Sequence, residues 1–200
     1  MESKILLFNK WDLSEVHSND PGLAGKMNLN PIIVPRTGGK YTTTEFHKSK
    51  MSIVERFMNK LMVAGHRGKR HQITSGRCAG NTQVLYNAVK DAFEIIQKKT
   101  GKNPVQTLVD AIDNSAVIEE VASYRLGGII ARKAVIVSPQ RRLDLSLRFL
   151  SQGIYKSAFK SKKKIADVIA EELLAAASGD TKAFAVSEKN RLEREAEGAR

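Results

Sequence analysis

The sequence predicts a mainly α-helical fold: a bundle of about five to six helices, a protruding β-hairpin and an irregular N-terminal arm. Beyond residue 50, apolar residues recur with the spacing of helices that bury one face. The exception is a pair of β-branched runs separated by two glycines. We therefore expect an extended arm over residues 1–46 and a helical domain over residues 47–200, with the hairpin at about 117–137.

The predicted arm is punctuated by prolines and glycines and has no helical or strand periodicity. Only the segment from Ile32 to Val34 could form a short extended stretch. Such a segment rarely folds alone, and it becomes ordered when it lies on another surface.

Three helices are predicted to follow the arm, over residues 51–64, over residues 82–99 and from Pro104 onward. Asn103 can cap the third helix, and Gln106 stands at the capping-box position. Between the first two helices, residues 66–80 form a basic loop. In the first helix we assign these residues to the buried face: Val54, Phe57, Met58, Leu61 and Met62. We expect Glu55, Arg56 and Lys60 on its other faces.

The hairpin is predicted from two β-branched runs, residues 117–126 and 129–137, joined by Gly127 and Gly128. Because an isolated hairpin is marginally stable in water, it must lean on the helices or on a partner.

A fourth helix is predicted to start at Ser138, as the cap, and Pro139. Its buried stripe is predicted to be Leu143, Leu147, Leu150 and Ile154, with Arg141, Arg142 and Arg148 outside. A fifth helix follows the basic run 160–164 and ends near Gly179, before a charged and helical tail.

The charge indicates a polyanionic partner. The chain carries a net charge of +12, and residues 36–80 and 119–164 each carry +8. A membrane is disfavoured, because no run approaches the roughly 18 apolar residues that a spanning helix needs. The start of the chain also lacks a signal-peptide core. A single cysteine, Cys78, fits a reduced cytosolic setting.

The sequence does not support catalysis, and we expect no enzyme activity, metal or cofactor. The segment from Gly65 to Lys69 has two residues between its glycines, where a phosphate-binding loop needs four. His66, His71 and Cys78 lack the fourth ligand of a structural zinc site.

Three partners remain: structured RNA, duplex DNA or an acidic protein. The basic residues are spread over an arm, a loop, a hairpin and a helix start. This spread favours many phosphate contacts on an irregular RNA surface over one recognition helix in a DNA groove. The main alternative to a structural RNA-binding protein is a regulatory protein that binds another RNA or duplex DNA, and a protein-only scaffold is the second alternative.

The chain also resembles the universal small-subunit ribosomal protein family numbered seven, in its archaeal or eukaryotic branch. The motifs run almost from end to end and include Asp20-Pro21-Gly22-Leu23, Asn30-Pro31-Ile32-Ile33-Val34-Pro35, Ile53-Val54-Glu55-Arg56, Tyr86-Asn87-Ala88, Asn103-Pro104, Gly127-Gly128, Ser138-Pro139-Gln140-Arg141-Arg142 and the terminal Arg200. The hairpin departs from the family at its start, where residues 116–120 are less polar than in relatives.

The resemblance implies a cytoplasmic ribosomal protein that binds the 3′ (head) domain of the small-subunit rRNA and helps nucleate head assembly. It also implies that the hairpin lines the tRNA exit site near mRNA, and that the small-subunit protein numbered eleven is a neighbour. With further basic residues of the same segments, the predicted rRNA contacts are Arg36, Lys40, Lys48, Arg67, Lys69, Arg70, Arg77, Arg141, Arg142, Arg148, Lys162 and Lys163. The predicted residues near tRNA or mRNA are Arg125, Gly127, Gly128, Arg132 and Lys133, and the tail contributes Arg200.

Overall fold

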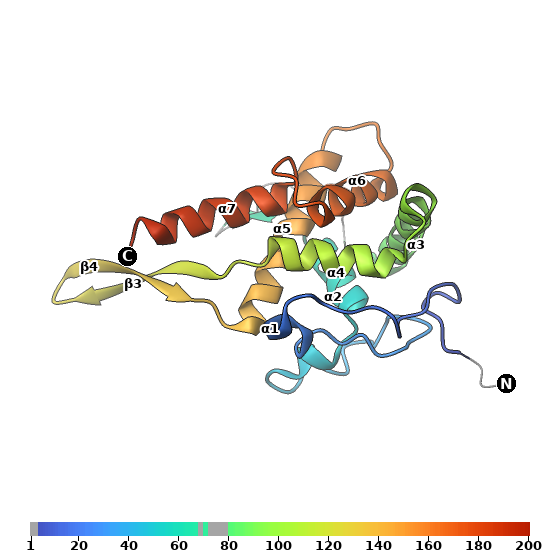
Figure 1. Cartoon of the computed structure of the whole chain (residues 1–200), viewed down its shortest axis with the longest axis horizontal. Helices are drawn as coiled ribbons and strands as arrows, with labels where there is room; N and C mark the ends of the chain where they lie inside the picture. Colours follow the sequence, from blue (N-terminus) through green and yellow to red (C-terminus); the bar gives the residue numbers. More distant parts are fainter. Residues whose placement is uncertain (1–3, 68–69, 72–79) are drawn as a thin grey trace.

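The computed structural model describes residues 4–67, 70–71 and 80–200, and it confirms the mainly helical fold with one long hairpin. Figure 1 shows a body of packed helices from which the hairpin extends to one side, with the C-terminal helix running above it. The helices are α1 (Pro21–Ala24), η1 (His47–Lys50), α2 (Ile53–Leu61), α3 (Thr82–Thr100), α4 (Pro104–Ser115), α5 (Pro139–Ala158), α6 (Ile165–Ala177) and α7 (Phe184–Glu197). The strands are β1 (His66–Arg67), β2 (Arg70–His71), β3 (Glu119–Leu126) and β4 (Ile129–Ile136).

Helix α5 lies at the centre of the body and packs against α1, α2, α4, α6 and α7. The four residues of its predicted stripe, Leu143, Leu147, Leu150 and Ile154, are all fully buried. Burying such a side chain stabilises a fold by about 1.5–3 kcal/mol, so this stripe is a large part of what holds the helices together.

The N-terminal arm lies on the body of the chain itself. Phe8 and Trp11 are buried, and their rings meet Tyr86 and Phe93 of α3 edge to face, with centroid separations of 4.8 Å for Phe8–Tyr86 and 5.7 Å for Trp11–Phe93. The indole Nε1 of Trp11 donates to Gln97 at 2.9 Å. The arm is therefore anchored by aromatic packing, while the boundary at residue 46 stays a prediction.

The helix starts differ from the predicted ones in two details. Asn103 caps α4 as predicted, because its side chain accepts from the backbone N–H of Val105 at 3.0 Å. The capping-box role of Gln106 is wrong: its amide donates to the carbonyl of His17 in the arm at 2.9 Å. Ser138 is the N-cap residue of α5 and Pro139 its first residue, as predicted, but the Ser138 side chain makes no cap hydrogen bond; its backbone carbonyl accepts from the N–H of Arg142 at 2.9 Å.

The hairpin follows the predicted pattern. Strands β3 and β4 pair antiparallel, with Leu126 opposite Ile129, and Gly127 and Gly128 form the two-residue turn with φ of 54° and 92°. Both values lie in the left-handed region that favours glycine. The hairpin leans on α7, where Glu193 accepts from the backbone N–H of Ile118 at 3.1 Å.

Helices α5, α6 and α7 meet at a glycine. A Cβ added at Gly153 of α5 would lie 2.4 Å from Oε1 of Glu172 and 2.8 Å from Cβ of Phe184. The Glu172 side chain is buried and accepts from the backbone N–H of Ala185 at the start of α7. Burial raises the pKa of this carboxyl. Residue 153 must therefore be glycine for α6 and α7 to approach α5.

We expect Gly153→Ala to destabilise the protein by about 1–3 kcal/mol, because the added methyl group overpacks this contact. At an unconstrained position inside a helix, replacing glycine by alanine stabilises the fold by up to about 1 kcal/mol. The sign of the change in the free energy of unfolding therefore distinguishes a packed glycine from an unconstrained one. Urea unfolding followed by circular dichroism measures it. The control is Ser157→Ala at an exposed position of the same helix. A Gly153→Ala protein as stable as the wild type would contradict the packing described here.

Candidate nucleic-acid interface

Two of the predicted contact residues are paired with carboxylates at the base of the hairpin. The guanidinium of Arg142 is mostly buried, donates to Asp20 at 2.6 Å and also donates to the carbonyl of Val117 at 3.2 Å. The guanidinium of Arg141 donates two hydrogen bonds to the carboxylate of Glu120, from Nε to Oε1 at 2.5 Å and from Nη2 to Oε2 at 2.8 Å. The expectation that Arg142 stays outside is wrong: Arg142 joins α1, α5 and the hairpin.

Further predicted residues also have partners. Lys163 contacts both carboxylate oxygens of Glu171, at 2.8 and 2.7 Å. Arg200, at the end of the tail, contacts both oxygens of Glu119 at the start of β3, at 2.9 and 2.7 Å. The tail is therefore fastened to the hairpin.

A buried ion pair joins α2 to α5. Arg56, which is 5% exposed, donates to Asp144 at 3.0 Å and to the carbonyl of Lys26 at 3.3 Å. Lys48 of η1 contacts the other carboxylate oxygen of Asp144. Burial alone would raise the pKa of Asp144, but the hydrogen bond from Lys48 and the charge of Arg56 outweigh it and lower that pKa.

Two residues of α2 therefore lie where the sequence analysis did not expect them. Glu55 and Arg56 were placed on outer faces of the first helix, and both are buried. Glu55 accepts from the backbone N–H and the hydroxyl of Thr37, at 2.8 and 2.7 Å. These contacts and the Arg56–Asp144 pair let the two charged side chains be buried.

A groove of about 480 Å³ lies between α2 and α5. It is lined by Asn59, Lys60, Val63, Ala64, Arg148, Ser151 and Gln152. Burial lowers the pKa of the half-buried Lys60 ammonium, and the nearby charges of Arg148, Lys48 and Arg56 lower it further, while Asp144 opposes them. The groove is thus concave and strongly positive.

Among the predicted contact residues outside the groove whose side chains are described, those without a carboxylate partner in the described part of the chain lie on the arm, the hairpin and the α5–α6 connection. Each is exposed to solvent. The set comprises Arg36, Lys40, Arg125, Arg132, Lys133 and Lys162. The structure does not gather them into one patch around the groove: they extend over the arm, both strands of the hairpin and the α5–α6 connection.

The basic loop is only partly described. Arg67 and Arg70 lie opposite each other in the short β1–β2 ladder, which the sequence analysis did not predict. The ends of the loop are joined by a hydrogen bond from Gly80 N–H to the Met62 carbonyl, at 3.3 Å. The predicted contact residues Lys69 and Arg77 lie outside the described residues.

Sequence reasoning missed Lys60 as a site residue and Asp144 as the carboxylate that organises the groove. Lys60 follows Arg56 by four residues, so both lie on one side of α2. That spacing is a weak signal, and Asp144 is 88 residues from Arg56.

The described residues contain neither a candidate metal-binding cluster nor a candidate membrane-spanning helix. Within residues 4–67, 70–71 and 80–200, no group of three or more His, Cys, Asp or Glu side chains is placed to hold a metal ion. Nor does any helix in these ranges have the length and apolar character needed to cross a membrane.

A helical body with a positive groove, an extended hairpin and exposed cations defines a structural RNA-binding protein. Comparisons with known proteins agree. The family model described as ribosomal protein S7p/S5e matches residues 26–200. The chain is 44% identical to small ribosomal subunit protein uS7 of Archaeoglobus fulgidus, over the full chain and 97% of that protein. Its identity to the uS7 proteins of Methanoregula boonei and Methanosphaera stadtmanae is 42% and 45%, covering 100% and 96% of this chain and 92% and 97% of theirs. The chain belongs to the ribosomal protein S7p/S5e family, whose members are structural proteins and not enzymes.

We expect Asp144→Asn to lower the free energy of unfolding at pH 7 by about 3 kcal/mol, because Arg56 loses its buried counter-charge. The pKa of Asp144 is lower in the folded protein than its ordinary value of 3.8, so the ionised carboxylate stabilises the fold at pH values above 3.8. This stabilisation is lost as the pH falls from 3.8 through the lowered pKa of the folded state. The difference between variant and wild type should therefore narrow below pH 3.8. Urea unfolding at several pH values measures it.

The matched control is Asp91→Asn, which removes an exposed carboxylate of α3. This control should differ little from the wild type across the same pH range. An Asp144→Asn deficit that stays constant from pH 7 to pH 3 would rule out the carboxylate charge as its cause.

Proposed function

We propose that this chain is a structural component of the small ribosomal subunit and binds the 3′ (head) domain of its rRNA. The observation that carries the proposal is the full-length match to archaeal uS7 proteins. The uncompensated cations of the groove, arm and hairpin support it, because they provide the charge that RNA phosphates require.

The binding mechanism is physical. Lysine and arginine side chains neutralise backbone phosphates and release the counterions that RNA holds, and the released ions make binding favourable and dependent on salt. The rigid body fixes where these side chains lie. Arg148 in the groove and Arg36 and Lys40 on the arm are the most available candidates, since all three are exposed. By fixing this RNA surface, the protein helps to nucleate assembly of the head.

The hairpin is assigned to the exit site, near the departing tRNA and the mRNA. Arg125, Arg132 and Lys133 are exposed on it and suit phosphate contacts.

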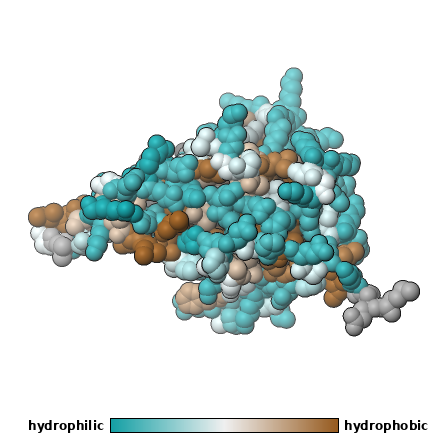
Figure 2. Space-filling model, viewed as in Figure 1, coloured by the Kyte–Doolittle hydropathy of each residue, from teal (hydrophilic) through white to brown (hydrophobic). Residues whose placement is uncertain are grey.

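The outer end of the hairpin also carries apolar side chains, with Ile129 74% exposed and Ile130 59% exposed, and Figure 2 shows hydrophobic atoms there. Such a tip suits contact with a neighbouring protein, such as the small-subunit protein numbered eleven. The setting is the cytoplasmic ribosome.

Sucrose-gradient sedimentation of extract from cells that express a tagged chain tests the proposal. We expect the chain to migrate with small ribosomal subunits and to remain there in moderate salt. Free chain at the top of the gradient, with none on the subunits, would defeat the proposal. A protein that binds another RNA or duplex DNA outside the ribosome would then be the function to pursue.

For the hairpin, we expect Arg132→Gln combined with Lys133→Gln to speed the release of deacylated tRNA from the exit site about tenfold, since charged hydrogen bonds are lost. Assembly into subunits should persist, because the body is untouched. Filter binding with reconstituted subunits measures the release rate. Lys99→Gln with Lys102→Gln, at exposed positions around the end of α3, removes the same charge as a control. Equal release rates for both double variants would remove Arg132 and Lys133 from the tRNA contact.

A further inference from the structure

The groove between α2 and α5 contains two cations that no described carboxylate neutralises. Lys60 comes from α2 and Arg148 from α5, and both line the groove. Neither forms an ion pair with a carboxylate of the described residues. The nearest acid, Asp144, is already engaged by Lys48 and Arg56.

Positive charges therefore outnumber negative charges among the described residues around the groove. The charges of Arg148, Lys48 and Arg56 oppose the charge of the Lys60 ammonium, and the Asp144 carboxylate favours it. Half-burial of Lys60 removes part of the water that would otherwise screen this repulsion. An external anion between the half-buried Lys60 and the exposed Arg148 would offset this repulsion, and the groove of about 480 Å³ provides the space for it.

We infer that the α2–α5 groove seats a backbone phosphate of the bound RNA, with Lys60 and Arg148 as its two cationic ligands. The inference rests on the proposed function, which supplies the RNA. The groove volume of about 480 Å³ lies in the range of small-ligand sites, about 300–1,000 Å³, so a phosphate and its adjoining sugar can enter. An arginine offers a planar, two-pronged contact to phosphate oxygens, and a lysine adds a compact charge.

Asp144 determines which of the neighbouring cations remain available to bind the phosphate. Because Asp144 pairs with Arg56 and Lys48, Lys60 and Arg148 are the two groove-lining cations that have no carboxylate partner among the described residues. The phosphate in turn balances the repulsion that Lys60 experiences. Lys60 is thus a binding residue, whereas Arg56 is a residue that positions α2 against α5.

The test compares Lys60→Gln, Arg148→Gln and the double variant with the wild type. The probe is a transcript of the 3′ domain of small-subunit rRNA from Archaeoglobus fulgidus, and affinity is measured at several salt concentrations. We expect the double variant to bind about tenfold more weakly at low salt, and the slope of log affinity against log salt to fall by about 1.

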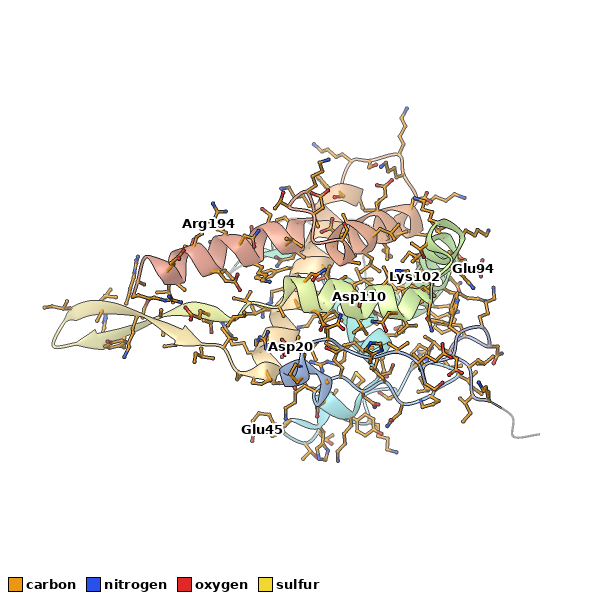
Figure 3. All side chains as sticks on the ribbon, in the orientation of Figure 1. Asp20, Glu45, Glu94, Lys102, Asp110 and Arg194 are labelled. Atoms are coloured by element: carbon orange, nitrogen blue, oxygen red, sulfur yellow. The ribbon has the colours of Figure 1, made fainter. Side chains whose placement is uncertain are left out.

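The matched control is Lys99→Gln with Lys102→Gln, which removes the same charge from exposed positions around the end of α3. Figure 3 shows Lys102 at the end of the body opposite the hairpin. This control should change affinity less than about twofold. Circular dichroism verifies that all variants are folded, and neither Gln substitution breaks a described ion pair.

A second readout separates binding from structure. Acetic anhydride labels lysine amines, and mass spectrometry reports each site with and without the RNA. We expect RNA to protect Lys60 and to leave Lys102 unchanged. If the wild type binds the RNA but the double variant equals the control, or Lys60 is labelled equally with and without RNA, the phosphate seat is overturned. If the wild type does not bind the RNA at all, the proposed function fails instead.

Discussion

The carboxylate of Asp144 accepts hydrogen bonds from two elements that are distant in sequence. Arg56 reaches it from α2, and Lys48 reaches it from η1 at the end of the arm. Since the Arg56 side chain is only 5% exposed, α2 and α5 cannot pack as they do unless this charge is compensated. The same contact fixes the walls of the groove. The positive surface and the arrangement of the helices therefore depend on one acid in the second turn of α5.

A second constraint is the way the arm is attached. Phe8 and Trp11 pack edge to face with rings of α3, and Gln106 of α4 binds the backbone of His17. Arg142 of α5 then binds Asp20 at the start of α1. Each contact uses a side chain of the helical body to satisfy or bury a group of the arm. The arm, in turn, leads into η1, whose Lys48 pairs with Asp144 and acts on the pKa of Lys60, so the packing of the arm and the electrostatics of the site are linked.

The helices and the hairpin could be predicted because their signals are local. The spacing of Leu143, Leu147 and Leu150, and the two glycines of the turn, each lie within one element. The arm's packing could not be predicted, because Phe8 and Trp11 meet residues some eighty positions away and have no periodic pattern of their own. The burial of Arg56 was missed for the same reason: on α2 alone, a paired arginine is indistinguishable from a solvated one, and its partner is 88 residues distant.

The candidate site could likewise be predicted only as far as its signals were local in sequence. Counting charges by segment located the basic regions but could not separate cations that hold the fold together from cations left for a partner. Arg142 and Arg200 proved to be engaged with Asp20 and Glu119, whereas Arg148 has no carboxylate partner among the described residues. A paired cation must give up an internal contact before it meets a phosphate, while an unpaired one gives up only water. Affinity for RNA should therefore concentrate in the unpaired group, and the paired group should contribute less than its formal charge suggests.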